Sequence, residues 1–218
     1  MDDLQRLLTQ NRAWADKMER QTPGFFQKLS GLQAPNFLWI GCADSRVPAN
    51  EIVGLLPGEM FVHRNVANIV SHSDLNCLSV LQYAVEVLKV RHVIVCGHYG
   101  CGGVIAAQQN KRMGLIDNWL RSVQDVQEKY RNVLDSTAEK ERGDRLCELN
   151  VLEQAVNVCQ TTVVQNAWDR KQELTVHGWI YRLTDGLLHN LGVQVSSPEG
   201  LADYYKVTQG SGISIPRG

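Results

Sequence analysis

Apolar residues recur along the chain at two spacings, and each spacing predicts one type of element. In the polar N-terminal segment the apolar residues recur near helical spacing: Leu4, Leu7, Leu8, Trp14 and Met18. They predict an amphipathic helix whose apolar stripe needs a partner. A second short helix is expected after Pro23, and Pro35 interrupts the chain before the next element.

Three short apolar runs of strand length follow, at 37–42, 60–63 and 92–97. Between the second and the third run, apolar residues at helical spacing predict a helix over 76–90. A strand, a helix and a strand in this order imply right-handed parallel crossovers. Because the strands are almost continuously apolar, both faces of their sheet should be covered. The pattern therefore predicts an α/β fold, with a parallel-sheet core flanked by helices.

The remainder of the chain is predicted to be helical first and extended afterwards. Residues 115–171 have a helical pattern, with a charged interruption at 135–144 that indicates a solvated turn. Residues 173–188 are typical of a hairpin, which adds a C-terminal edge strand. The stretch 196–218 contains several Gly, Ser and Pro residues and predicts a loosely ordered tail.

The composition is that of a globular protein. Of the 218 residues 44% are hydrophobic and 21% are charged, so a sizeable core can form. Because the sequence contains no internal repeat and no linker, we treat 1–218 as one domain with a helical arm at 1–34. The 22 Lys and Arg residues nearly balance the 23 Asp and Glu residues, which leaves no global positive field for nucleic acid.

The apolar stretches are too short for a membrane partner. The run 93–96 is among the longest, whereas a helix that crosses a bilayer needs about 20 apolar residues. The sequence starts with two acids and lacks the apolar segment of a secretory signal. We therefore expect a cytoplasmic protein whose six cysteines stay reduced, as buried thiols or as metal ligands.

Two cysteine segments come directly after predicted strands. The first includes Cys42 and Asp44, and the second, which is rich in glycine, includes His98 and Cys101. Ligands of open parallel sheets bind beyond the carboxyl ends of the strands, so both segments should open on one edge. Two thiolates and an imidazole suit a tetrahedral zinc ion and leave one position free, for which Asp44 is a possible fourth ligand.

Two other interpretations of these segments stay open at this point. Unpaired cysteines are among the most buried residue types, so Cys42 and Cys101 could be small core residues and His98 a hydrogen-bonded core histidine. We adopt that interpretation for the other four cysteines: Cys77, Cys96, Cys147 and Cys159. The glycines at 97–103 could instead cradle a phosphate, but their spacing differs from G-x-G-x-x-G.

The two motifs, Cys-x-Asp-x-Arg at 42–46 and His-x-x-Cys at 98–101, resemble those of the β-class carbonic anhydrases. The segments around them, 39–48, 57–68 and 96–103, resemble the bacterial members of that family. The resemblance implies an enzyme with one zinc ion per chain that interconverts CO₂ and water with bicarbonate and a proton. It also implies an N-terminal arm across a neighbouring subunit, in a homodimer that often pairs into a tetramer.

The resemblance further implies roles for single residues. Zinc held by Cys42, His98 and Cys101 would carry the hydroxide that attacks CO₂. Asp44 would be the fourth ligand in a closed form and would pair with Arg46 in an open form, so that the pair acts as a gate. The implied substrate pocket includes Gln33, Phe61, Val66, Tyr83 and Gly102.

One regulated bacterial subgroup of the family binds bicarbonate away from the metal, at positions that match Trp39, Arg64 and Tyr181. Arg64 would pair with the anion, and the indole N–H and phenol O–H are further donors. Bicarbonate bound there would favour the closed, inactive form. Because two thiolates leave zinc a weaker acid, we expect activity to rise with pH above neutral.

Two other functions are compatible with the same motifs. An enzyme on the same scaffold could hydrolyse a linear CO₂ analogue such as carbon disulfide. A zinc protein permanently capped by Asp44 could act as a sensor without catalysis. Activity in alkaline buffer separates the enzyme from the sensor.

Overall fold

The computed structural model describes residues 2–31 and 33–199, and the chain divides into two units, 1–34 and 35–218. The first unit contains α1 (Asp3–Gln21) and α2 (Phe25–Gly31), which confirms the two predicted N-terminal helices. Every described residue of α1 is exposed or half-buried, and Leu4, Leu7 and Leu8 are all more than half exposed. The apolar stripe of α1 is thus presented to solvent in the single chain.

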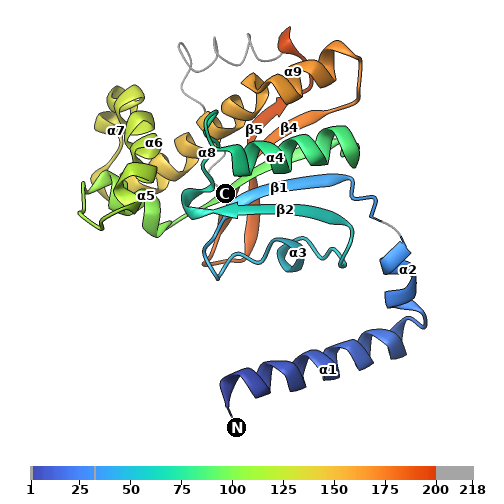
Figure 1. Ribbon diagram of the computed structural model, residues 1–218. Coiled ribbons are helices and arrows are strands. Elements are labelled where there is room, and N and C mark those ends of the chain that lie inside the picture. Colours follow the sequence, from blue (N-terminus) through green and yellow to red (C-terminus); the bar gives the residue numbers. More distant parts are fainter. Residues whose placement is uncertain (1, 32, 200–218) are drawn as a thin grey trace. The chain divides into compact units, whose positions relative to one another are not determined.

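The second unit is built on a five-stranded sheet with the strand order β2-β1-β3-β4-β5 (Figure 1). The bounds of the strands are β1 Phe37–Cys42, β2 Met60–Asn65, β3 His92–His98, β4 Thr175–Arg182 and β5 Leu187–Val195. The first four strands are parallel to their neighbours, and β5 pairs with β4 in the antiparallel direction. The predicted α/β fold and its C-terminal hairpin are therefore confirmed.

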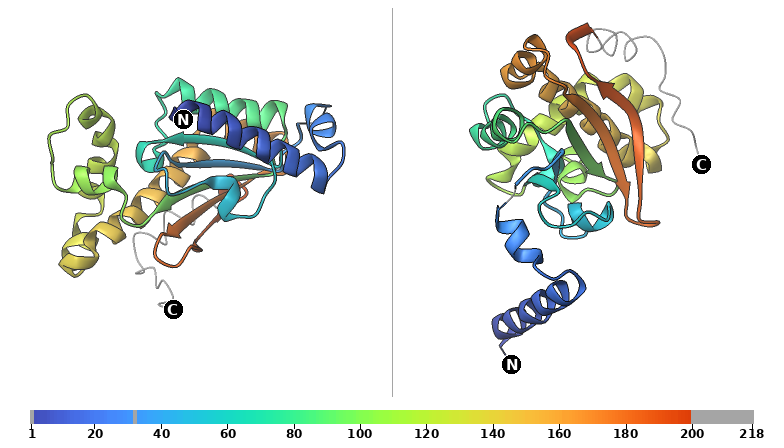
Figure 2. Two further views of the ribbon diagram at one scale, coloured as in Figure 1. Left: turned by 90° about the horizontal axis from the view of Figure 1, so that it is seen from below. Right: turned by 90° about the vertical axis from the view of Figure 1, so that its right-hand side faces the viewer.

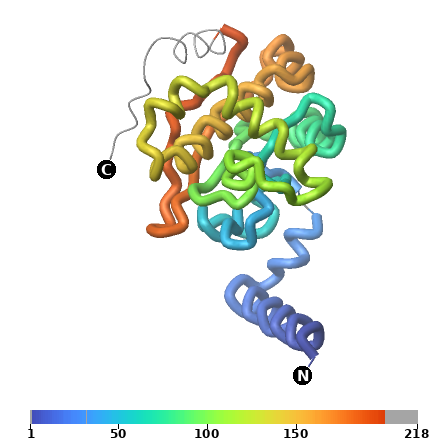
Figure 3. Tube along the Cα trace, turned by 90° about the vertical axis from the view of Figure 1, so that its left-hand side faces the viewer, coloured from blue at the N-terminus to red at the C-terminus, as the bar shows by residue number. Residues whose placement is uncertain are grey.

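The helices and short helical turns of this unit fill the connections between strands. Their bounds are α3 Ala49–Ile52, η1 Val66–Asn68, α4 Leu75–Gln82, η2 Tyr83–Val87, α5 Gly102–Gln108, α6 Ile116–Lys129, α7 Arg131–Ser136, η3 Glu139–Glu141, α8 Arg142–Gln160 and α9 Thr162–Asp169. Helices α4, α8 and α9 cover one face of the sheet, and the segment that contains α3 covers the other (Figures 1 and 2). Helices α5, α6 and α7 gather at the carboxyl end of the parallel strands (Figure 1), on the side that faces the viewer in Figure 3.

Burial follows the alternation of side chains along the strands. In β1, Leu38 and Ile40 belong to the large core under α4 and α8, whereas Trp39 belongs to a smaller apolar cluster that includes Ala49 of α3. Leu38, Trp39 and Ile40 are all fully buried, as expected for a strand covered on both faces. Helix α8 is buried continuously from Leu146 to Leu152 and forms the centre of the large core.

Two details differ from the predicted elements. The helix predicted over 76–90 ends as a π-helical turn at Tyr83–Val87, after α4. The charged stretch 135–144 is more helical than the predicted turn, because α7 continues to Ser136 and α8 begins at Arg142. None of the described helices is both long and apolar enough to cross a bilayer. Most of the predicted loose tail, 200–218, lies outside the described residues.

Two histidines face each other where β3 and β4 begin. His92 Nδ1 and His177 Nε2 are 3.2 Å apart, and the ring of His92 stacks on Phe37 at a centroid distance of 5.5 Å. Burial, with the neighbouring His92 as the second cause, lowers the pKa of His177. The fold therefore favours the neutral form of this imidazole.

We expect the protein to lose stability in mild acid through His177. The pKa of histidine is about 6.5 in an unfolded chain. Because folding lowers the pKa of His177, its contribution is fully present above that value and decreases as the pH falls below it. One proton limits the slope to about 1.4 kcal/mol per pH unit. Urea unfolding between pH 5 and pH 7 should show a shallower dependence in His177→Gln than in the wild type, and equal slopes would contradict the assignment.

Candidate metal centre

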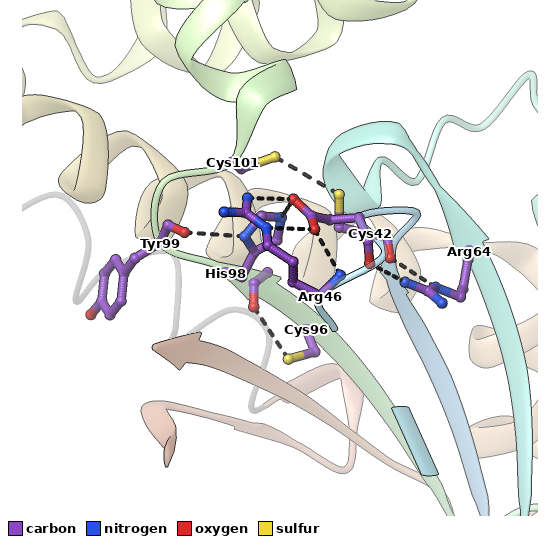
Figure 4. A network of polar contacts seen from close by, with 9 residues as sticks. Cys42, Arg46, Arg64, Cys96, His98, Tyr99 and Cys101 are labelled. Atoms are coloured by element: carbon purple, nitrogen blue, oxygen red, sulfur yellow. Dashed lines mark hydrogen bonds and ion pairs between the residues drawn. The ribbon is translucent and has the colours of Figure 1, made fainter. Parts of the chain in front are cut away.

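Three metal-binding side chains meet where β1 and β3 end (Figure 4). Cys42 is the last residue of β1, His98 is the last residue of β3, and Cys101 immediately precedes α5. Each side chain offers one ligand atom, and the three atoms lie within 4.8 Å of one another. The structure thus brings the three residues together at the sheet edge where the sequence places them.

The geometry of these donors fits a zinc ion. The sulfur atoms of Cys42 and Cys101 are 3.8 Å apart. Tetrahedral zinc with Zn–S bonds of about 2.3 Å requires a sulfur separation of about 3.8 Å. His98 Nε2 is buried and makes no hydrogen bond to any described residue, whereas Nδ1 lies 3.1 Å from the carbonyl oxygen of Tyr99. This contact favours the proton on Nδ1, and it leaves the lone pair of Nε2 free for a metal.

The contact between the two thiols shifts their pKa values in opposite directions. The hydrogen bond from the Cys101 thiol lowers the pKa of Cys42 against the opposing effect of burial. His98 and the backbone N–H groups of Asp44 and Ala67 contribute in the same direction. The pKa of Cys101 is raised by its bond to Cys42 and by burial. A bound cation would favour both thiolates, since the thiolate is the metal ligand.

The carboxylate of Asp44 is held by Arg46. Arg46 Nε donates to Oδ1 at 2.9 Å and a terminal guanidinium nitrogen donates to Oδ2 at 2.7 Å, while the backbone N–H of Arg46 also donates to Oδ1. This bidentate pair keeps the pKa of Asp44 well below its usual range. Oδ2 nevertheless lies only 3.7 Å from His98 Nε2, so the carboxylate borders the metal-binding atoms.

Arg64 fixes the backbone that leads from Cys42 to Asp44. Its Nε donates to the carbonyl oxygen of Cys42 at 2.9 Å, and a terminal nitrogen donates to the carbonyl oxygen of Asp44 (Figure 4). Trp39 is fully buried, and Tyr181 packs against the same apolar cluster. The residues matched to a bicarbonate site therefore include an arginine that already binds the backbone of residues 42–44.

The residues matched to a substrate pocket are placed in smaller groups. The rings of Phe61 and Tyr83 lie 5.8 Å apart. Val66 lies next to α5, where a Cβ at Gly103 would be 2.8 Å from its Cγ1, and Gly102 is the first residue of that helix. Gln33 belongs to the first unit of the chain.

Buried polar side chains of α8 support the loop after β2, and the sequence analysis did not single them out. Asn150 donates to the carbonyl oxygen of Ala67 at 2.9 Å, and Gln154 accepts from the backbone N–H of Val70 at 2.8 Å. Ala67 and Asn68 both have positive φ, which this support stabilises. Polar residues on the buried side of a predicted helix are the signal that would have identified them.

A second group of donors, His63, Asp74 and Cys77, meets the same distance criterion but differs in chemistry. His63 Nε2 contacts the amide of Asn65, and Asp74 caps α4 by accepting from the N–H of Asn76. Burial raises the pKa of Cys77 to about 12. His63 Nε2 and Asp74 thus already have partners, in contrast to His98 Nε2.

The remaining cysteines are buried thiols, as the sequence predicted. Burial raises the pKa of Cys147 and of Cys159 to about 12, and it raises the pKa of Cys96 further. The Cys96 thiol donates to the carbonyl oxygen of Gly97 at 3.3 Å. Cys42 and Cys101 are thus the two of the six thiols that lie beside His98 at the candidate metal centre.

Known proteins provide an independent comparison. The carbonic anhydrase family profile matches residues 37–188. A carbonic anhydrase of Emericella nidulans is 47% identical over 210 residues, which cover 94% of this chain and 91% of that protein. A carbonic anhydrase of Candida albicans is 35% identical over 202 residues, which cover 91% of this chain and 71% of that protein. One of Pseudomonas aeruginosa is 33% identical over 76% of this chain and 77% of the bacterial protein.

Solved structures give the same result. A β-carbonic anhydrase of Coccomyxa, in complex with acetazolamide, superimposes with a TM-score of 0.88 at 39% identity and covers 97% of this chain and all of that one. One of two tetrameric β-carbonic anhydrases of Sordaria macrospora has a TM-score of 0.85 at 40% identity, over 90% of this chain and all of that one. Fungal relatives are thus more similar than the bacterial one, and the expected bacterial subgroup is not supported.

Proposed function

Because the chain belongs to the β-class carbonic anhydrases, we propose that the zinc ion of this CO₂-hydrating enzyme is held by Cys42, His98 and Cys101. The observation that carries the proposal is the pairing of two sulfurs 3.8 Å apart with an unpartnered imidazole nitrogen. In the other donor group found among the described residues, His63 Nε2 already contacts the side-chain amide of Asn65. Soft sulfur and imidazole ligands are those that zinc prefers.

Zinc bound there supplies a Lewis acid that makes a water molecule nucleophilic near neutral pH. The chain contributes the acid–base group beside that position. The Asp44 carboxylate stays ionised because Arg46 lowers its pKa, so it can accept a hydrogen bond and orient the reacting water. CO₂ has no net dipole and suits an apolar wall. We assign that wall to Phe61, Val66 and Tyr83, beside Gly102, and we assign a polar contact across the dimer interface to Gln33.

Arg46 and Asp44 act as a gate in this proposal. While Arg46 holds both carboxylate oxygens, the position beside the three donors stays open. Release of the carboxylate would let Asp44, whose Oδ2 is 3.7 Å from His98 Nε2, become a fourth ligand. A carboxylate can serve as a zinc ligand, and it would then exclude the reacting water.

Bicarbonate inhibition through Trp39, Arg64 and Tyr181 stays a prediction. The guanidinium of Arg64 donates to the carbonyl oxygens of Cys42 and Asp44. An anion bound to Arg64 would compete with these carbonyls and would disturb the loop that carries the gate. This route would connect anion binding to Asp44 without a direct contact to zinc.

We propose that the enzyme is a homotetramer, with the homodimer as its smaller unit, in the cytoplasm. The tetrameric relatives from Sordaria macrospora support the assembly. The exposed apolar stripe of α1 supports a role of the arm across a neighbouring subunit. Burial of apolar side chains between subunits would stabilise such an arm.

The proposed function is tested by metal content together with stopped-flow CO₂ hydration at pH 7 and pH 8.5. We expect about one zinc ion per chain and a rate that is higher at the alkaline pH. A zinc-loaded protein without activity at either pH would be a sensor rather than an enzyme. A zinc-loaded protein that hydrolyses carbon disulfide but leaves CO₂ unchanged would contradict the assigned substrate.

A further inference from the structure

An ion pair on α8, in which the glutamate is buried and the arginine is half-buried, holds the loop between two of the metal-binding residues. The hydroxyl of Tyr99 donates to Glu148 Oε1 at 2.7 Å, and Arg145 donates to Glu148 Oε2 at 2.8 Å. Glu148 is 8% exposed, so its charge would be costly without partners. Because both carboxylate oxygens are bound, the position of the Tyr99 side chain is fixed relative to α8.

Tyr99 is also connected to the metal ligand His98 through its backbone. The carbonyl oxygen of Tyr99 lies 3.1 Å from His98 Nδ1, while its side chain points away from the thiols (Figure 4). The N–H of Tyr99 donates to the carbonyl oxygen of Tyr181, and the Arg182 guanidinium lies 5.2 Å from the centre of the Tyr99 ring. The residue is thus held on both sides, and its carbonyl sets the plane of the imidazole.

We propose that Tyr99, Glu148 and Arg145 form a clamp that keeps His98 Nε2 directed at the two thiols and so slows the loss of zinc. Within the clamp, Tyr99 connects His98 to Glu148 and Arg145. Glu148 and Arg145 are therefore positioning residues, which act on the metal through His98. The inference rests on the proposed zinc centre. Partners that orient a metal-bound histidine commonly change metal affinity or activity by about tenfold to a hundredfold when they are removed.

The zinc-loaded full chain tests the clamp by its rate of zinc release to a chromogenic chelator, at a temperature at which every variant is folded. Tyr99→Phe removes one oxygen and should release zinc roughly tenfold to a hundredfold faster than the wild type. Glu148→Gln keeps an oxygen acceptor for Tyr99 and should release zinc more slowly than Glu148→Leu. If Glu148→Leu does not fold, Tyr99→Phe still decides the question.

Helix α8 provides a matched control. Glu153 accepts from Lys129 at 2.7 Å and from the hydroxyl of Tyr130 at 3.2 Å. Neither of these two partners belongs to the loop between His98 and Cys101. Tyr130→Phe likewise removes one tyrosine hydroxyl that donates to a glutamate of α8, and it should release zinc at the wild-type rate. Wild-type release from Tyr99→Phe, or equally fast release from Tyr130→Phe, would overturn the clamp alone. Purified wild-type protein without zinc would instead overturn the proposed metal centre.

Discussion

Cys42→Ala should lose its zinc and lower kcat/KM for CO₂ hydration by roughly a thousandfold or more, because the metal supplies the nucleophile at neutral pH. Cys42 contributes one of the two sulfurs that lie 3.8 Å apart. A single sulfur and one imidazole leave only two protein ligands, which is fewer than catalytic zinc sites use. The measurement is metal content and stopped-flow hydration of the same preparation.

Cys96→Ala is the control for this loss. It also removes a sulfur atom from a buried cysteine. The side chain of Cys96 lies in the apolar cluster of Trp39, whereas Cys42 belongs to the large core on the other face of the sheet. The variant should keep its zinc and most of its activity, although a small cavity lowers its stability. Retention of both zinc and activity in Cys42→Ala would show that Cys42 is not a zinc ligand.

Asp44→Asn should lower kcat/KM by roughly a hundredfold, because the carboxylate that accepts from the reacting water is lost. Arg46→Gln should lower it by about tenfold to a hundredfold at pH 7. It removes a bidentate pair and frees Asp44 to act as a zinc ligand. If Arg46 acts only by restraining Asp44, the double variant should resemble Asp44→Asn alone.

The surface pair of Arg131 and Glu128 offers a control for the loss of an arginine. Arg131→Gln should keep wild-type activity, since exposed ion pairs contribute little. A double variant of Asp44 and Arg46 whose defect equals the product of the two single defects would show that Arg46 acts independently. That outcome would contradict the gate, as would a wild-type rate in Asp44→Asn.

The predictable part of the site depends on short motifs at strand ends. Cys42 ends one continuous apolar strand and His98 ends another, with Cys101 shortly after it, so parallel strands alone place them at one edge. The strands themselves are recognisable because both faces are buried. The hairpin of β4 and β5, whose residues alternate between buried and more exposed positions, is predicted from its hairpin pattern instead, and the structure confirms it.

The supporting contacts were not predictable, because they join residues that are distant in sequence. Glu148 meets Tyr99 across 49 positions, and Arg64 reaches the carbonyl oxygen of Cys42 across 22. Periodicity describes which side of an element is buried, but it does not say which polar group on that side finds a partner. The π-helical turn at Tyr83–Val87 has the same apolar spacing as an ordinary helix at this length.

The most direct test of the zinc centre is X-ray absorption at the zinc edge on the purified full chain. We predict one zinc ion per chain with two sulfur neighbours at about 2.3 Å and lighter neighbours at about 2.0–2.1 Å, one of them an imidazole nitrogen. A zinc-free protein that hydrates CO₂, or a zinc ion with fewer than two sulfur neighbours, would contradict this prediction.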